Sequence, residues 1–119
     1  MTLRDALHPL LMLEGLTALA VLTSDGLPIE VIGYEGADTL AAELVTVANT
    51  VRRSMQALEL GTANRVSIAT EQGEAFIVPL EGYVLVAVFE LNDSGVAAQL
   101  IEKTKAPLAR ALEDAYELT

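Results

Sequence analysis

Few side chains in this sequence combine the residue types and the spacing of a catalytic site, and Asp25 is the first to consider. It follows Ser24 and precedes Gly26, between two apolar runs. A carboxylate there could act as a metal ligand or as a nucleophile. Asp-Gly between apolar runs is also a strong signal for a two-residue β-hairpin turn, because both central residues of that turn need a positive φ. We therefore interpret Asp25 as a residue that turns the chain.

The other candidates for catalysis lack partners in the sequence. His8 is the only histidine, and no serine or threonine has a recognisable base and orienting group. The 17 Asp and Glu residues are scattered, and the pair Glu71 and Glu74 flanks a predicted hairpin tip. Cysteine is absent and the glycines stand singly, so thiol chemistry and a glycine-rich phosphate loop are excluded. We expect no enzyme, no catalytic residues, no metal and no cofactor.

Arg52 and Arg53 form the one basic doublet in a chain that has seven Lys and Arg residues. Two interpretations stay open: they are solvated or ion-paired helix residues, or they contact an acidic surface of a partner. The net charge is −10 and the pI is near 4.3, so the phosphate backbone of a nucleic acid would be repelled. We expect no nucleic-acid partner.

Length and composition indicate one domain over residues 1–119. The hydrophobic fraction of 52% is high, which suggests that part of the surface is hidden in an oligomer interface. The longest apolar run, 83–89, has the length of a strand and is much shorter than the roughly 18 residues that span a membrane. We expect no membrane insertion. Because the first residues show no signal-peptide pattern, we also expect a cytoplasmic location.

Apolar periodicity predicts the order of the elements. Helical patterns cover 3–13, 37–61 and 94–118, and strand patterns cover 16–23, 27–34, 64–70, 75–80 and 83–91. Asp38 is the expected N-cap of the second helix and Gly61 its C-terminal stop. Pro9 argues against a long undisturbed first helix, and Pro107 is expected to kink or split the last one, since proline removes a backbone donor.

The helix over 37–61 has a wide apolar surface. One row of large residues recurs at spacings of three and four: Leu40, Leu44, Val47, Val51, Met55 and Leu58. A second row is made of smaller residues: Ala41, Val45 and Ala48. A helix with so wide a face can pack on a sheet and on another helix together. This width is the first indication of a dimer.

The strand patterns also predict positions in a sheet. The strands over 16–23 and 83–91 are apolar on both faces and belong in its middle. The strands over 27–34 and 64–70 alternate and belong at its edges. In the first of these edge strands, one face is expected to carry Leu27, Ile29 and Val31. With hairpin neighbours adjacent, the spatial order is 2-1-5-4-3. The sequence therefore predicts an α+β fold, a five-stranded antiparallel sheet with helices on both faces.

Three segments together resemble the Roadblock family: LEGLTALAVLTSDGLPIEV, LAAELVTVANTVRRSMQALELG and RVSIATEQGEAFIVPLEGYVLVAVFEL. The resemblance extends from about Leu10 to Leu112 and rests on the order and character of the elements. The family includes the dynein light-chain roadblock proteins and the MglB-type regulators of small Ras-like GTPases. Its profilin-like fold has the order α-ββ-α-βββ-α and strands 2-1-5-4-3, which agrees with the order that the burial patterns predict.

The resemblance further implies a homodimer or heterodimer in which the third strands pair edge to edge and the long central helices pack beside each other. On this sequence the implied dimer interface comprises Val47, Val51, Ser54, Met55 and Leu58 of the helix and Arg65, Val66, Ser67, Ile68, Ala69 and Thr70 of the strand. Arg52 and Arg53 are the candidate contacts to another partner.

For function, the resemblance implies a non-catalytic dimeric regulator or scaffold that binds a small Ras-like GTPase. Such a protein acts by preferring one arrangement of the GTPase switch loops over another. One alternative is a profilin-like sensory module that binds a small ligand, which the apolar character of the inward positions disfavours. Another is a structural adaptor without effect on nucleotide turnover. The sequence does not separate the adaptor from the regulator.

Overall fold

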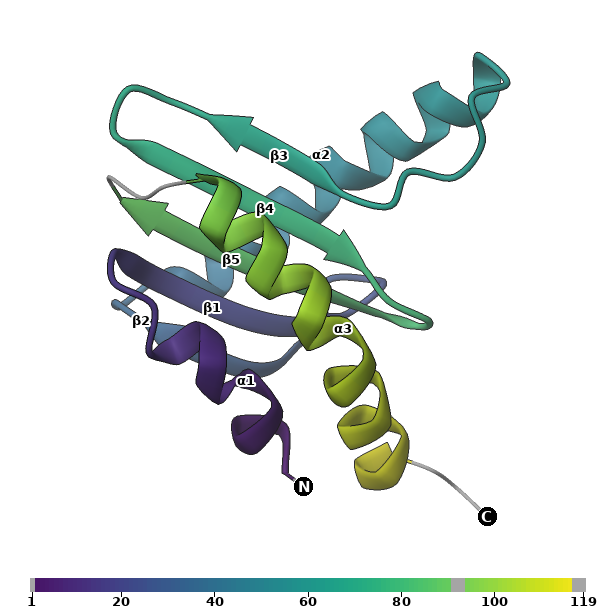
Figure 1. The fold of residues 1–119 in the computed structure, drawn as a ribbon. Coiled ribbons are helices and arrows are strands. Elements are labelled where there is room, and N and C mark those ends of the chain that lie inside the picture. Colours follow the sequence, from purple (N-terminus) through teal and green to yellow (C-terminus); the bar gives the residue numbers. More distant parts are fainter. Residues whose placement is uncertain (1, 91–93, 117–119) are drawn as a thin grey trace.

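The computed structural model describes residues 2–90 and 94–116, and its elements follow the predicted order (Figure 1). They are α1 (Leu3–Leu11), β1 (Leu16–Thr23), β2 (Pro28–Gly33), α2 (Ala37–Ala57), β3 (Val66–Ala69), β4 (Gly73–Pro79), β5 (Tyr83–Glu90) and α3 (Ser94–Tyr116). β1 has the predicted bounds, β3 is shorter than predicted, and β4 begins two residues earlier. The predicted ends of the last strand, at 91, and of the last helix, at 118, lie outside the described residues.

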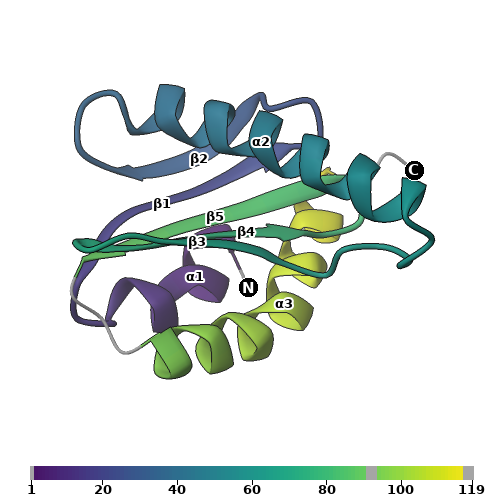
Figure 2. The same cartoon turned by 90° about the horizontal axis from the view of Figure 1, so that it is seen from above.

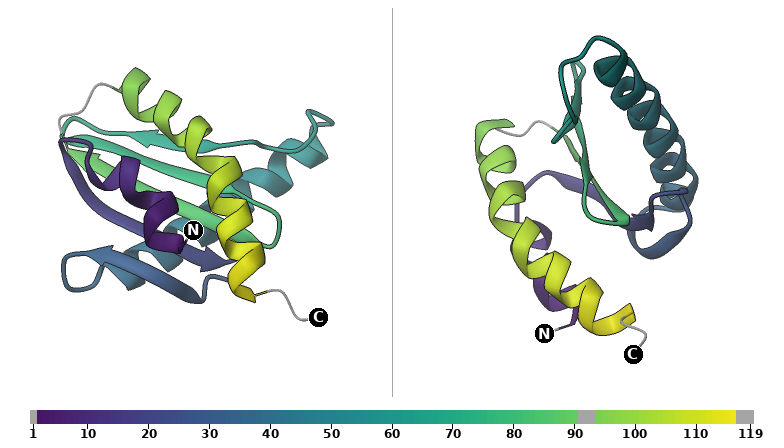
Figure 3. Two further views of the ribbon diagram at one scale, coloured as in Figure 1. Left: turned by 60° about the horizontal axis from the view of Figure 1, so that its bottom comes forward. Right: turned by 90° about the vertical axis from the view of Figure 1, so that its right-hand side faces the viewer.

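The five strands form one antiparallel sheet in the order β2-β1-β5-β4-β3, which confirms the predicted topology. β1 and β5 lie in the middle, and β2 and β3 lie at the edges. α2 covers one face of the sheet, whereas α1 and α3 lie together on the other face (Figure 2, Figure 3). The predicted α+β fold with helices on both faces is therefore confirmed.

The two faces of the sheet bury two separate sets of apolar side chains. Toward α1 and α3, Leu19 and Phe89 pack in one cluster with Ile101. Toward α2, Ala20 and Val86 belong to the other cluster. Because β1 and β5 contribute to both clusters, these strands need apolar residues at nearly every position.

The hairpin between β1 and β2 has a three-residue loop instead of the predicted two-residue turn. The N–H of Thr23 donates to the carbonyl of Leu27, and the N–H of Gly26 donates to the carbonyl of Thr23, both at 2.9 Å. Gly26 has a φ of 90°, whereas the φ of Asp25 is not positive. A turn followed by one left-handed residue is a common three-residue hairpin and needs only one glycine. Asp25 therefore lies in the turn, as predicted, and the Leu27 side chain is exposed rather than on the core face.

Ile29 and Val31 lie on opposite faces of β2, which corrects the expectation that they share one. Leu22 of β1 pairs with Pro28, whereas the preceding residue of β1 pairs with Glu30. Ile29 is therefore the extra residue of a β-bulge, which reverses the alternation of side chains. Ile29 packs with the cluster beneath α1 and α3, and Val31 packs with the cluster beneath α2.

α2 ends earlier than predicted, in a cap built around Glu59 and not Gly61. The N–H of Leu60 donates to the carbonyl of Met55, and the N–H of Glu59 donates to the carbonyl of Gln56, both at 3.0 Å. These two bonds form a Schellman cap, in which the residue after the C-cap is left-handed. Glu59 takes that position with a φ of 59°.

One further helix prediction needs correction. Gly36, and not Asp38, is the N-cap of α2, and the Asp38 carboxylate lies in the first turn, where its negative charge interacts favourably with the helix dipole. Of the two outcomes expected at Pro107, a kink or a split, the split does not occur, because α3 continues as one helix with Pro107 inside it. Ile101 and Leu108, on either side of the proline, are both fully buried, so packing holds the two halves in one element.

Candidate protein interaction surface

α2 packs on the sheet through its small residues and leaves its large ones incompletely covered. The residues of α2 that are buried are Ala37, Ala41, Val45 and Ala48. In the row of large residues, Leu40, Leu44, Val51 and Met55 are half-buried, and Val47 and Leu58 are exposed. Small side chains let the helix lie close to the sheet, whereas large ones would hold it away. The large apolar row is therefore available to another surface.

The C-terminal end of α2 extends past the edge of the sheet, beyond β3 (Figure 1). It carries two of the most exposed large apolar side chains among the described residues: Leu58 is 65% exposed and Leu60 is 69% exposed. Adjacent exposed apolar residues of this kind mark an interaction site more often than a solvated surface.

The outer edge of β3 is open. β3 pairs with β4, and no other strand of the described chain lies along its outer side. The N–H of Thr70 donates inward to the carbonyl of Gly73 at 2.7 Å, so strand alternation turns the backbone amides and carbonyls of Ser67 and Ala69 outward. The edge has no proline, lysine or bulge that would block pairing with another strand. It is therefore a template for a further strand.

The predicted interface residues of α2 and β3 meet at the end of the sheet where β3 begins. Val51 and Met55 of α2 line a cavity of about 420 Å³ together with Val66 and Ser67. Leu60, which the sequence reasoning did not include, lines the same cavity. The exposed end of α2 and the open strand edge thus form one continuous surface.

Three of the predicted interface residues have contacts within the chain. The guanidinium of Arg65 lies 5.9 Å from the centre of the Phe76 ring and 4.0 Å from a carboxylate oxygen of Glu102, on the α3 side of the sheet. The Ser54 hydroxyl donates to a carbonyl one turn earlier in α2, and the Thr70 hydroxyl accepts hydrogen bonds from the following turn. These side chains are less suited to an interface than their apolar neighbours.

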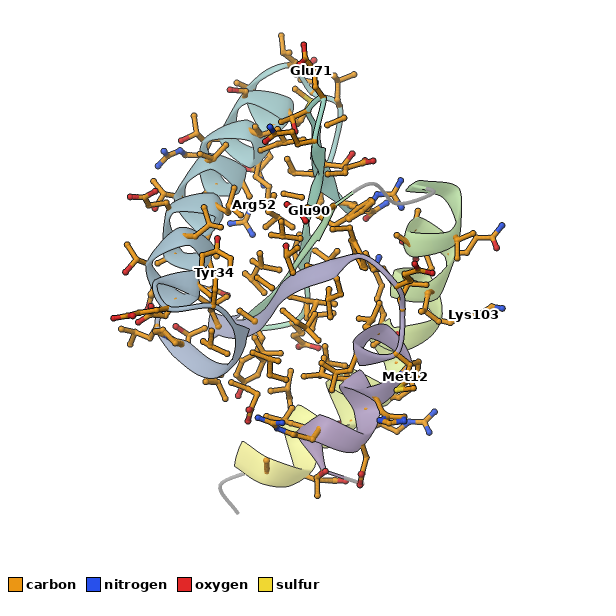
Figure 4. All side chains as sticks on the ribbon, turned by 90° about the vertical axis from the view of Figure 1, so that its left-hand side faces the viewer. Met12, Tyr34, Arg52, Glu71, Glu90 and Lys103 are labelled. Carbon is orange, nitrogen blue, oxygen red and sulfur yellow. The ribbon has the colours of Figure 1, made fainter. Side chains whose placement is uncertain are left out.

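The basic doublet divides between two sides of α2. Arg52 follows the row of small residues at helical spacing, is half-buried, and lies on the side of α2 that faces the sheet (Figure 4). Arg53 is exposed, and its guanidinium lies 3.5 Å from the Thr50 hydroxyl. Within the described part of the chain neither arginine forms an ion pair. Their positive charges therefore remain available to a partner.

A larger cavity of about 520 Å³ lies at the opposite end of β3, beneath the N-terminal half of α2. Its apolar walls include Leu40, Leu44, Ile68 and Val88. Tyr34, Glu74 and Glu90 add polar groups, and no lysine or arginine is found in its lining among the described residues. Figure 4 looks at the molecule from this end and shows Tyr34 and Glu90 there. The sequence analysis did not predict this cavity. The available indication of it was the apolar row of α2, to which Leu40 and Leu44 belong.

The residues considered for catalysis are not brought together. His8 is exposed on α1, and Asp25 lies in a hairpin turn. The Thr2 N–H, 3.0 Å from the Asp5 carboxylate, and the Thr2 hydroxyl hold the pKa of Asp5 below its usual range, which reflects a helix cap. No group of three His, Asp or Glu residues suited to a metal ion occurs among residues 2–90 and 94–116.

These features define a profilin-like α+β domain with a candidate protein interaction surface. The family model for the Roadblock/LC7 domain matches residues 3–90, and the chain belongs to the Roadblock/LC7 family. This family includes small-GTPase regulators and is generally non-catalytic. A comparison with curated protein sequences found no match.

Solved structures of the same fold agree with this assignment. A Roadblock/LC7 domain from Streptomyces avermitilis is 19% identical, with a TM-score of 0.78, over 99% of this chain and 100% of that one. A gliding protein MglB from Thermus thermophilus is 17% identical, with a TM-score of 0.76, over 94% of this chain and 86% of that one. An MglB described with a tetrameric arrangement is 18% identical, with a TM-score of 0.77, over 95% and 86%.

In the described ranges 2–90 and 94–116, no helix combines the length and the apolar character needed to cross a membrane. α2 and α3 are long enough, but charged residues recur along both.

Proposed function

We propose that this protein is a non-catalytic dimeric regulator or scaffold that binds a small Ras-like GTPase. The single observation that carries the proposal is the open surface formed by the large apolar row of α2 and the edge of β3. Membership of the Roadblock/LC7 family supplies the GTPase as the class of partner. A cytoplasmic location and a single domain over residues 1–119 are parts of the same proposal.

In the proposed homodimer, the β3 strands of two copies pair antiparallel, and the two α2 helices lie beside each other. The outward backbone groups of Ser67 and Ala69 would then gain hydrogen-bond partners, and Val51 and Met55 would lose contact with water. Pairing edge strands extends the sheet across both copies and removes the open edge. One contact between two copies would thus cover the large apolar row of α2 and pair the open edge of β3.

Regulation in this proposal works through binding alone. A platform that binds one conformation of the GTPase switch loops more tightly shifts their equilibrium by the difference between the two affinities. Arg52 and Arg53 are the proposed contacts, because they form no ion pair within residues 2–90 and 94–116 and belong to a chain with a net charge of −10. They would bind an acidic surface of the partner.

Affinity capture tests the GTPase assignment. The immobilised protein is incubated with a lysate of the source organism in parallel with a GTP analogue or with GDP. We expect a small GTPase to be retained in one nucleotide state and lost from a variant with Arg52→Glu and Arg53→Glu. A variant with Lys103→Glu and Arg110→Glu on α3 makes the same change of charge elsewhere and should retain it. The absence of any GTPase in both states would contradict the proposal, and a captured protein of another class would favour the structural adaptor.

The cavity of about 520 Å³ favours one other candidate, a sensory module that binds a small ligand. Apolar walls with a few polar groups are typical of ligand sites. If the protein is such a sensory module, the proposed dimer would leave the cavity open to solvent. The identity of what occupies the cavity therefore separates the sensory module from the GTPase-binding regulator or scaffold.

A further inference from the structure

The two edges of the sheet differ in what protects them. β2 forms the edge opposite to β3 (Figure 1), and no other strand of the described chain lies along its outer side. Its residues Ile29, Val31 and Ile32 are half-buried and belong to the types that favour strands. An apolar edge strand of this kind is a template for further strands unless the chain protects it.

Pro28 removes a hydrogen-bond donor from the outer side of β2. The N–H of Thr23 donates to the carbonyl of Leu27 at 2.9 Å, so these two residues form a bonded pair. Bonded and non-bonded pairs alternate in an antiparallel ladder, and the next pair is Leu22 with Pro28. The backbone of Pro28 therefore faces outward, where a proline has no N–H to offer to an incoming strand.

A bulge and an ion pair protect the next part of the strand. The bulge at Ile29 interrupts the regular spacing of the backbone groups and increases the twist of the edge. Beside it, the Glu30 carboxylate accepts hydrogen bonds from the Arg4 guanidinium of α1 at 3.0 and 3.2 Å. A second β2 strand would bring its own Glu30 close to this one, and carboxylates that face each other across a strand pair destabilise it. These are the devices that protect edge strands, and β3 has none of them.

We propose that β2 is an edge closed to strand addition, so that the sheet extends through β3 alone. With two open edges, copies would pair alternately through β3 and through β2 and form a sheet without end. A closed β2 stops this growth after one pairing. The closure of β2 follows from its own contacts, whereas the limit of two copies in one sheet rests on the dimer in the proposed function.

Removing the protection tests this closure. In the edge variant Glu30 is deleted and Pro28→Val restores the missing N–H. The deletion removes the ion pair and the bulge together, and it lets Ile29 pair with Val21 while the Ile29 side chain stays in the cluster beneath α1 and α3. The matched control carries Glu113→Thr and Pro107→Ala, which remove the same residue types and the same charge from α3.

Sedimentation equilibrium measures the result, with circular dichroism as the check of folding. We expect the mass of the edge variant to pass twice the chain mass of 12.6 kDa as the concentration increases, while the control keeps the mass of the unmodified chain. Adding Ser67→Pro, which blocks β3, should leave pairing through β2 and give a dimer. If the deletion prevents folding, Pro28→Val with Glu30→Thr keeps the bulge and should also gain mass, although less.

A folded edge variant that keeps the mass of the unmodified chain at every concentration would overturn the closure of β2. An unchanged mass of the folded Pro28→Val and Glu30→Thr variant would overturn it equally, since the proline and the charge are each expected to protect the edge. An unmodified chain that stays a monomer, beside an edge variant that associates, would support the closed β2 edge and contradict the dimer in the proposed function.

Discussion

The two faces of the sheet differ in how completely the chain covers them. On the closed face, the large residues Ile101, Leu108 and Leu112 of α3 are buried at 0–1% exposure. On the open face, α2 buries mainly alanines, while Leu58 stays 65% exposed. The chain completes one core by itself and leaves the other open along β3.

This difference in coverage indicates which face of the sheet needs a partner. An incompletely covered apolar row and an unpaired strand edge each favour association with another chain, and here they lie side by side. Burial of a fully exposed leucine contributes about 1.5–3 kcal/mol, so a few such residues are enough to stabilise a contact. Mutations on the closed face should therefore affect folding, and mutations on the open face should affect association.

The largest expected difference is between Leu108→Ala and Leu58→Ala. Leu108 is fully buried, so its truncation should lower the free energy of unfolding by about 2–5 kcal/mol. Leu58 is mostly exposed, so its truncation should change the stability of the monomer by no more than about 0.5 kcal/mol. Urea unfolding at a protein concentration too low for association measures both. Similar losses for the two variants would contradict the distinction between the faces.

Val51→Asp should act on association instead of folding. Val51 is half-buried and lines the cavity of about 420 Å³ between α2 and β3, so a dimer would bury the new carboxylate at a cost of several kcal/mol unless it is paired. Circular dichroism should remain unchanged, while sedimentation equilibrium should show a monomer. Val96→Asp, at a partly exposed position on α3, is the matched control and should leave association intact. An unchanged Val51→Asp dimer would place the interface elsewhere.

Two proline substitutions in β3 compare its outward backbone groups with the inward ones that pair with β4. Ser67→Pro removes an outward N–H that has no partner in the chain, so the monomer should fold while strand pairing is blocked. Ile68→Pro removes an inward N–H of the ladder to β4, which should lower the free energy of unfolding by about 1–3 kcal/mol. Thermal unfolding and sedimentation of both variants check this. Retained dimer in Ser67→Pro would show that the β3 edges do not pair.

Glu59→Gly should have the smallest effect. Glu59 is the one described non-glycine residue with a positive φ, and glycine adopts that conformation without the steric cost of a Cβ. The substitution should raise the free energy of unfolding by about 0.5–1 kcal/mol and leave the open face unchanged. A loss of stability in thermal unfolding would mean that the Glu59 side chain itself stabilises the end of α2.

The sequence was sufficient for the order of elements and for the topology of the sheet. Runs that are apolar on both faces, 16–23 and 83–91, can only be satisfied in the middle of a sheet, and alternating runs fit its edges. Single-residue features were harder. The bulge at Ile29 and the left-handed conformation of Glu59 depend on how neighbouring elements pack. The local residue pattern does not predict either of them.

The orientation of α2 was the least predictable part of the candidate site. Both of its rows are apolar, so periodicity alone cannot tell which one faces the sheet. Close approach to the sheet selects Ala41 and Ala48, and this selection leaves Leu40 and Leu44 over the cavity. The interface residues Val47, Val51, Ser54, Met55, Leu58 and 65–70 remain predictions. The cavity, which needs α2, β3 and β5 together, could only be found in three dimensions.

Sedimentation equilibrium of the unmodified chain over a wide range of concentrations tests the central claim most directly. If the open face of α2 and β3 is a self-association surface, the mass should rise from that of one chain, 12.6 kDa, to twice that value as the concentration increases. A mass of 12.6 kDa at every concentration would contradict the claim.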